Sequence, residues 1–330
     1  MPERLQELNK WLATQPELGQ YKIAPASADA SFRRYFRVSF DGTSLIVMDA
    51  PPDKEDCGPF VQIGRAMRDM GLSVPEILAQ DAKQGFLLLS DLGSISYLEQ
   101  LNQDTVERLY GDAIGALATL QVSGRKFSDI FPPYNRELLM NEMELFREWF
   151  LSRHLGIKLT PEQNQILDQA FDVLAKSALE QPQVCVHRDY HSRNLMVNEK
   201  QNPGILDFQD AVIGPFTYDL VSLLRDCYID WPREQVEDWA LGFQALALQS
   251  GIIEQENDAQ FLKWFDLMGV QRHLKAIGIF ARLNIRDNKP GYLADIPRTL
   301  GYVLEVSSRY PELSALHNLL KTLGVKDRAS

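Results

Sequence analysis

Cysteine is scarce in this sequence. The 330 residues include three cysteines, and an odd number of cysteines cannot all pair within one molecule. Cys57, Cys185 and Cys227 are far apart in sequence and follow no metal-binding spacing. We therefore expect reduced, mostly buried thiols, as is usual in a cytoplasmic protein, rather than a disulfide framework or a structural zinc site.

Long apolar runs and excess positive charge are also missing. No apolar segment approaches membrane-spanning length, and the first residues lack the apolar stretch of a secretory signal peptide. Lys and Arg number 34 against 45 Asp and Glu, a net charge of −11. This balance argues against nucleic acid and against an anionic membrane as partners. With 45% hydrophobic and 24% charged residues, the composition is ordinary for a soluble globular protein. We expect a cytoplasmic protein, and nothing in the sequence implies an obligatory protein partner.

Two polar segments between apolar runs carry the chemistry that the sequence suggests. They are HRDYHSRN at 187–194 and LDFQD at 206–210, and their apolar flanks predict buried strands around tight loops. Phosphoryl transfer needs a carboxylate to orient the attacking hydroxyl, and carboxylate and amide oxygens to hold Mg²⁺ against the nucleotide phosphates. We predict Asp189 as the base, and Asn194 and Asp207 as magnesium ligands.

The alternative for these segments is a polar turn that happens to contain Asp and Asn. However, H-R-D-x-x-x-x-N followed by D-F is the catalytic-loop and metal-loop pattern of the protein-kinase-like fold. Four matched positions with strand-like flanks favour the kinase interpretation. A catalytically inactive relative remains an alternative, although the intact Asp189, Asn194 and Asp207 argue against it.

The first ninety residues are predicted to form a nucleotide-binding lobe. Alternating and apolar runs indicate a hairpin over 23–51 with its turn at Asp41-Gly42. A helix over 53–70, ended by Gly71, and two strands near 75–78 and 86–89 follow. This order is that of the small lobe of a kinase-like fold.

Two parts of a kinase nucleotide lobe are absent from this region. The small-residue run at 26–31, which would cover the phosphates, contains no glycine, and the strand Ile46–Asp49 contains no ATP-binding lysine. Because unpaired phosphate charge in a cleft is costly, we expect Arg33 or Arg34 to replace the lysine. The alternative is one solvated and one ion-paired arginine. The predicted nucleotide-binding residues are Ser31, Phe32, Arg33, Arg34, Leu89 and Asp91.

The rest of the chain is predicted to be mainly helical. The expected fold class is α+β, with a small mixed β-sheet N-lobe at 1–89, a hinge at 90–93 and a large, mainly helical catalytic and acceptor-binding C-lobe at 94–330. Acceptor contacts are expected from residues 131–155 or from the helices after Asp226. Helical periodicity is seen at 2–13, 109–120, 138–155, 218–227, 239–249, 261–286 and 292–309.

With these residues in view, the chain resembles the aminoglycoside phosphotransferase and choline kinase-like family. Protein kinases usually carry Lys two residues after the catalytic Asp, whereas small-molecule kinases of this family carry His, as His191 does here. The runs LDFQDA at 206–211 and YDL at 218–220 also match. The resemblance implies a bilobal protein-kinase-like fold that uses ATP and Mg²⁺ to phosphorylate a small molecule.

Longer runs at 29–37, 47–52 and 206–228 are similar to those of bacterial kinases of cell-wall amino sugars. This resemblance implies transfer of the ATP γ-phosphate to the anomeric C1 hydroxyl of N-acetylmuramate and N-acetylglucosamine. Two alternatives stay open. One is a kinase of the same fold for an aminoglycoside, choline or homoserine, and the other is a nucleotide-binding pseudokinase that acts as an adaptor.

Overall fold

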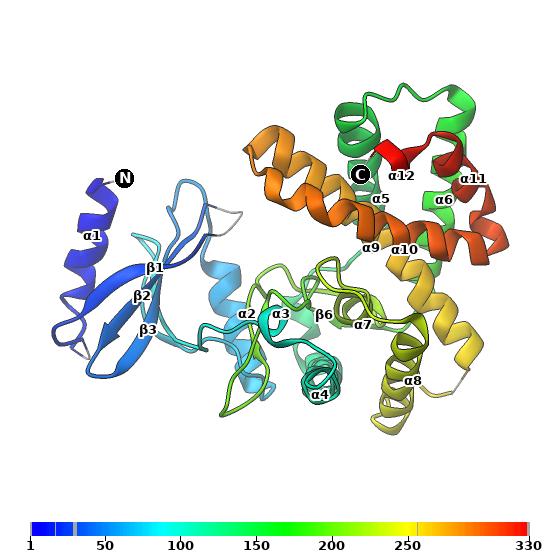
Figure 1. The fold of residues 1–330 in the computed structure, drawn as a ribbon. Coiled ribbons are helices and arrows are strands. Elements are labelled where there is room, and N and C mark those ends of the chain that lie inside the picture. Colours follow the sequence, from blue (N-terminus) through cyan, green and yellow to red (C-terminus); the bar gives the residue numbers. More distant parts are fainter. Residues whose placement is uncertain (1, 17, 29–31, 256, 329–330) are drawn as a thin grey trace. The chain divides into compact units, whose positions relative to one another are not determined.

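The computed structural model of the protein describes residues 2–16, 18–28, 32–255 and 257–328 (Figure 1). The chain divides into two compact units, residues 1–100 with 194–210 and residues 101–193 with 211–330. These limits differ from the predicted lobes, because residues 194–210 pack within the N-terminal unit. The assignment of nucleotide and acceptor to separate lobes stays a prediction.

The first unit is built on a five-stranded sheet in the order β1-β2-β3-β5-β4. Its four strand pairs are all antiparallel, so the mixed sheet expected from the sequence is not found among the described strands. The turn at Asp41 and Gly42, with φ of 47° and 76°, makes β2 and β3 an antiparallel hairpin. The strands are β1 (Lys22–Ala28), β2 (Arg34–Phe40), β3 (Thr43–Asp49), β4 (Ile77–Asp81) and β5 (Phe86–Ser90).

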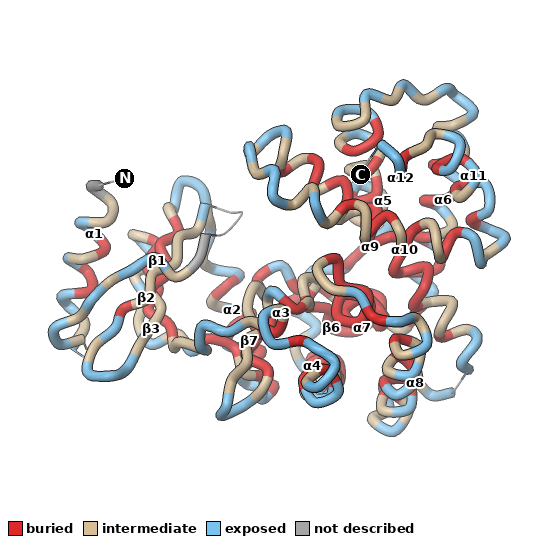
Figure 2. Tube along the Cα trace, viewed as in Figure 1, coloured by how far each residue is buried: buried red, intermediate tan, exposed pale blue. Residues whose placement is uncertain are grey.

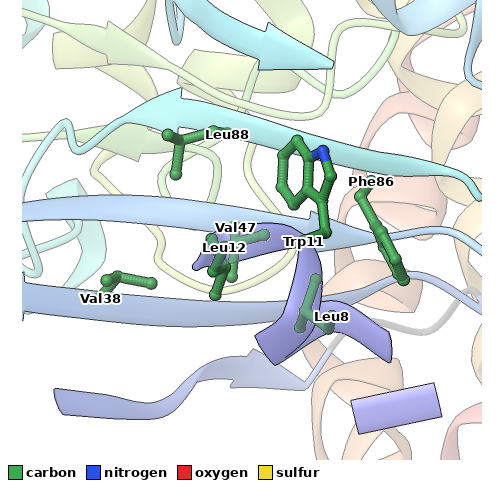
Figure 3. Close-up of a cluster of buried hydrophobic side chains, with 7 residues drawn as sticks. All are labelled: Leu8, Trp11, Leu12, Val38, Val47, Phe86 and Leu88. Atoms are coloured by element: carbon green, nitrogen blue, oxygen red, sulfur yellow. The ribbon is translucent and has the colours of Figure 1, made fainter. Parts of the chain in front are cut away.

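Helix α1 (Pro2–Leu12) covers one face of this sheet. Its buried residues Leu8, Trp11 and Leu12 pack against the strand residues Val38, Val47, Phe86 and Leu88 (Figure 3). Helix α2 (Gly58–Asp69) begins later than the predicted helix over 53–70, because residues 52–54 form a turn in which the Lys54 and Glu55 N–H groups donate to the Pro51 carbonyl.

The segment 194–210 completes the first unit. Strands β7 (Leu195–Met196) and β8 (Gly204–Ile205) pair with each other, and the Ile205 N–H donates to the Ser73 carbonyl at 2.7 Å. The Phe208 ring lies 4.8 Å from that of Phe60 on α2. A Cβ at Gly64 would meet the Phe208 ring at 3.1 Å, so this close packing depends on glycine. The short helix α3 (Tyr97–Gln100) ends the N-terminal part of the unit.

The second unit is helical apart from the two-stranded pair β6 (Gln183–Val186) and β9 (Val212–Pro215). Helix α9 (Asp258–Asp287) packs against several other helices of the unit, and Figure 2 shows buried residues along much of its length and throughout α7. The other helices are α4 (Val106–Gly124), α5 (Arg136–Leu145), α6 (Pro161–Leu179), α7 (Tyr218–Leu224), α8 (Arg233–Gln249), α10 (Ile296–Arg309), α11 (Ser314–Thr322) and α12 (Val325–Arg328).

Shorter helical segments connect these elements. The π-helix η2 (Phe146–His154) continues α5, and 3₁₀ segments lie at η1 (Arg125–Ile130), η3 (Pro290–Asp295) and η4 (Pro311–Leu313). None of the described helices is long and apolar enough to cross a membrane. The three cysteines are free thiols, two of them buried, as the sequence predicts.

Candidate functional site

The predicted catalytic loop follows strand β6 in the second unit. The carboxylate of Asp219, in the first turn of α7, accepts hydrogen bonds from the backbone N–H of His187 at 2.6 Å and of Arg188 at 2.9 Å. Arg188 has a φ of 77°, a conformation that non-glycine residues adopt only when their surroundings enforce it. Burial raises the pKa of Asp219 to about 7, while the two N–H groups and nearby Arg272 oppose this rise. Asp219 therefore fixes the backbone that leads into Asp189.

Asp189 lies among cationic and imidazole side chains. Burial alone would raise its pKa, but interactions with Lys275, His191, His187 and Arg188 lower it below the usual value. The Asp189 N–H donates to Nδ1 of His187 at 3.2 Å, and its carbonyl accepts from the His191 N–H at 3.0 Å. A carboxylate kept ionised in this way can orient a substrate hydroxyl and accept its proton.

A buried carboxylate on α5 balances the cations near Asp189. Glu142 forms ion pairs with Arg188 and with Lys275, whose Nζ lies 3.0 Å from Glu142 Oε1. Lys275 also donates to the Tyr218 hydroxyl at 3.1 Å, and Tyr134 donates to Glu142. Burial opposes ionisation of Glu142, yet Lys275 and Arg188 hold its pKa below the usual value. The network presents a fixed set of charges to the catalytic loop.

The second half of the loop is attached to the segment after α7. Ser192 donates from its backbone N–H at 2.9 Å and from its hydroxyl to Asp226. The His191 ring meets the Tyr228 ring edge-on with centroids 5.3 Å apart. Burial lowers the pKa of His191, which favours the neutral imidazole. His191 thus contributes packing and hydrogen-bonding capacity rather than a fixed positive charge.

The two predicted magnesium ligands lie together in the first unit. The Leu206 N–H donates to the Asn194 carbonyl at 2.9 Å, and Asn194 Nδ2 lies 3.4 Å from Asp207 Oδ2. Gln209 donates to the other carboxylate oxygen of Asp207 at 2.8 Å, and Asp207 has a φ of 61°. The described residues contain no group of three or more His, Cys, Asp or Glu side chains that could hold a metal ion.

This donor set fits Mg²⁺ of the kind that nucleotide-dependent enzymes use. Magnesium takes oxygen ligands, keeps several waters, and is usually bound by one or two carboxylates together with substrate phosphates. One carboxylate and one amide on adjacent strand ends match that requirement without a complete protein cage. The roles of Asn194 and Asp207 as ligands remain a prediction.

The two predicted phosphate-side arginines have different surroundings. Arg34 donates from Nε at 3.1 Å and from Nη2 to Asp49, its direct partner across β2 and β3. The buried Asp49 also accepts from Arg4 of α1 at 2.7 Å. Arg34 is therefore part of the packing between α1 and the sheet.

Arg33 instead pairs with Glu55 at 3.2 Å. Burial opposes the charge of Arg33, but Tyr35, Glu55 and Asp207 together raise its pKa, so the charge of Asp207 acts on this guanidinium. Both arginines are ion-paired, whereas the alternative considered from the sequence had one of them solvated. Of the two, Arg33 is the better candidate to replace the strand lysine.

The other predicted nucleotide-binding residues are spread through the first unit. Ser31 lies outside the described residues. Phe32 is 64% exposed, and its N–H donates to Glu55 at 3.2 Å. Leu89 is buried in β5, where it pairs with Ile46. Leu89 could contact a nucleotide through its apolar side chain or through a backbone hydrogen bond.

The Asp91 carboxylate is occupied by protein groups. It accepts from Arg37 Nε at 2.6 Å, from Ser44 Oγ at 2.7 Å and from the Gly93 N–H at 3.0 Å. Burial opposes ionisation, but these donors lower the pKa of Asp91. Its side chain thus shapes the predicted hinge, and a nucleotide contact here would come from the backbone.

Sequence reasoning missed the charged residues that surround the catalytic loop. Glu142 stands on an otherwise apolar face of α5, Lys275 follows the buried polar residues Gln271 and Arg272 on α9, and Glu55 lies between a turn and α2. A charged residue on an apolar helical face is the one signal that could have drawn attention to Glu142. Nothing in the sequence pairs Glu142 and Lys275 with each other or with Asp189.

Comparison with known proteins identifies relatives along the whole chain. The family model described as "Phosphotransferase enzyme family" matches residues 22–256. The N-acetylmuramate/N-acetylglucosamine kinase of Pseudomonas aeruginosa is 46% identical over 97% of each chain. The protein of the same name from Pseudomonas putida is 45% identical over 100% of each chain. That from Neisseria meningitidis is 44% identical, covering 97% of this chain and 96% of the other.

Solved structures share the fold at low sequence identity. The choline kinase LicA from Streptococcus pneumoniae superposes with a TM-score of 0.62 at 11% identity, covering 91% of this chain and 99% of that one. The ADP-bound aminoglycoside phosphotransferase APH(2'')-Ib gives 0.59 at 16% identity, covering 92% and 98%. These likenesses confirm the predicted kinase-like α+β fold, and the sequence matches show that the chain belongs to the phosphotransferase enzyme family.

Proposed function

We propose that this protein is an ATP-dependent kinase that phosphorylates the anomeric C1 hydroxyl of N-acetylmuramate and N-acetylglucosamine during cell-wall recycling. The observation that carries this proposal is the match, at 44–46% identity over at least 96% of each chain, with three proteins named as kinases of these two sugars. An amino sugar is accordingly the proposed small-molecule partner, and ATP the proposed phosphate donor.

The catalytic loop supports this chemistry. Asp189 is kept ionised by the cations around it, so it would accept a hydrogen bond from the acceptor hydroxyl and take its proton as the phosphate is transferred. Asp219 holds the backbone on the N-terminal side of Asp189, and Asp226 holds it on the C-terminal side. Most of the rate gain would come from this positioning, as is usual for phosphoryl transfer.

The first unit supports a nucleotide site. Asn194 and Asp207 would hold Mg²⁺, which supplies charge neutralisation at the phosphates when bound. Arg33, oriented by Glu55 and within the electrostatic influence of Asp207, would bind phosphate oxygens in place of the missing strand lysine. The ion pair with Glu55 restricts the orientations of the guanidinium.

Phosphate transfer from magnesium-ATP to a panel of acceptors tests the proposal. The panel contains N-acetylmuramate, N-acetylglucosamine, kanamycin and choline, and phosphorus NMR identifies the phosphorylated position. We expect a sugar 1-phosphate from the first two compounds. Turnover of kanamycin or choline alone would overturn the substrate, and ATP binding without turnover of any acceptor would favour the pseudokinase alternative.

A further inference from the structure

Arg193, the last residue of the catalytic loop before Asn194, carries a weakly paired cation. Its guanidinium carbon lies 3.6 Å from the centre of the Tyr228 ring and 5.6 Å from that of Tyr292. The carboxylate of Asp295 is 3.8 Å away, which is beyond hydrogen-bond distance. The side chain is 42% exposed, and within the described parts of the chain nothing accepts a hydrogen bond from it.

Other arginines of the same unit are committed to protein acceptors. Arg233 donates to both carboxylate oxygens of Asp266, and Arg298 donates to the Cys227 carbonyl at 2.7 Å. Arg188 is buried against Glu142. Compared with these, the planar donor edge of Arg193 is available to a ligand that brings its own acceptors.

The surroundings of Arg193 link it to the catalytic base. Arg193 follows Asp189 by four residues, and Asp226 clamps Ser192, which precedes Arg193, through two hydrogen bonds. The Tyr228 ring touches Arg193 on its face and His191 at 5.3 Å. The position of Arg193 is therefore tied to that of the loop that carries Asp189.

An aromatic surface extends from this point. The Tyr228 and Phe280 rings have centroids 6.2 Å apart, and Phe280 stacks on Tyr292 at 5.7 Å. Tyr228 and Tyr292 are partly exposed, while Phe280 is buried beneath them. Partly exposed aromatic rings beside a few fixed polar groups are typical of small-molecule sites.

We propose that Arg193, held between Tyr228 and Tyr292, binds the carboxylate of an acid-bearing acceptor and thereby sets the preference between the two sugars. N-acetylmuramate carries a lactyl ether that ends in a carboxylate, and N-acetylglucosamine has a hydroxyl there. A guanidinium offers two parallel donors that match a carboxylate. Asp295 steadies the cation from a distance and leaves those donors open. This inference rests on the proposed function.

The test compares Arg193→Gln and Arg193→Lys with the unmodified enzyme on both sugars. We expect Arg193→Gln to lower kcat/KM for N-acetylmuramate by about 10- to 100-fold, the range for loss of a hydrogen-bonded charged contact. The value for N-acetylglucosamine should change by less than about twofold. Arg193→Lys should recover part of the loss, because it restores the charge without the paired donors.

Two controls isolate the carboxylate. Arg108 on α4 lies 3.8 Å from Asp112, with a side chain 63% exposed, so Arg108→Gln removes a similarly weakly paired arginine outside the expected acceptor region and should leave both kinetic values unchanged. The methyl ester of N-acetylmuramate removes the ligand's charge instead. The unmodified enzyme should discriminate acid from ester, and Arg193→Gln should not.

The outcomes separate this inference from the proposed function. Equal losses of kcat/KM for the two sugars in Arg193→Gln would overturn the inference, since they would mean that Arg193 binds phosphate or maintains the conformation of the loop. The inference would also be overturned if Arg193→Gln discriminated between N-acetylmuramate and its methyl ester as strongly as the unmodified enzyme does. If the unmodified enzyme phosphorylates neither sugar, the proposed function fails and the inference fails with it.

Discussion

Replacing Glu142 by Gln tests whether the buried charge network supports the second unit. Glu142, Arg188 and Lys275 have side chains that are 7%, 17% and 13% exposed. Glu142→Gln keeps the volume and an acceptor for Tyr134 but removes the negative charge. Two buried cations are then left with Asp189 as their nearby acidic partner.

The expected loss is large because breaking a buried ion pair by removing one partner costs about 3–5 kcal/mol. At about 2–4 °C per kcal/mol for a domain of this size, we expect the midpoint of thermal unfolding to fall by about 6–20 °C. Differential scanning calorimetry measures the midpoint, and urea unfolding gives the free energy. Adding Lys275→Met should restore part of the loss, since it removes one of the uncompensated cations.

Glu148→Gln is the matched control. Glu148 pairs with Arg153 in the adjoining η2, and both side chains are about half exposed. An exposed pair of this kind contributes about 0–1 kcal/mol, so the unfolding midpoint should barely change. If Glu142→Gln were no more destabilising than Glu148→Gln, the argument that the buried carboxylate balances Arg188 and Lys275 would be refuted.

Three further predictions concern catalysis and packing. Lys275→Met should move the acidic limb of the kcat/KM profile to higher pH, because Lys275 lowers the pKa of Asp189 and its loss raises it; a limb that stays in place contradicts this role. Asp207→Ala should reduce kcat by at least about 10³-fold through loss of a magnesium ligand, with an unfolding midpoint close to that of the unmodified protein; retained turnover would exclude the metal role. Gly278→Ala should lower the free energy of unfolding in urea by about 1–3 kcal/mol, because the added Cβ would lie 2.4 Å from the backbone at the end of α5. Gly242→Ala on α8 should raise the free energy of unfolding by about 0.5–1 kcal/mol, because its added Cβ would have no atom within 4 Å. Similar effects of the two alanines would contradict the packing argument.

The part of the site that could be predicted is the part that depends on residues close together in the sequence. Asp189, Asn194 and Asp207 stand on loops between short strands, as the motif spacing predicts. Their chemistry depends on residue type at fixed positions along a few adjacent residues, so one sequence is enough to suggest it. The ligand roles themselves await the experiments above.

The part that could not be predicted depends on contacts between distant elements. Glu142 and Lys275 are 133 positions apart and meet because α5 packs against α9. No local pattern records such a pairing. The different surroundings of Arg33 and Arg34 likewise depend on strand register, which places Arg34 opposite Asp49. Hydrophobic period also predicted one helix over 138–155, because it does not distinguish the α-helix from the π-helical turns that begin at Phe146.

The packing of Phe208 on Phe60 and Gly64 has a consequence for the order in which the protein forms at the ribosome. The N-terminal unit is discontinuous, since it needs residues 194–210 to cover α2. Proteins emerge from their N-terminus and fold as each unit becomes complete. The sheet of this protein can assemble early, but its unit closes only after residue 210 has been made. By then, residues 101–193 of the other unit have already been synthesised, so the first unit to begin folding cannot finish before much of the second is present.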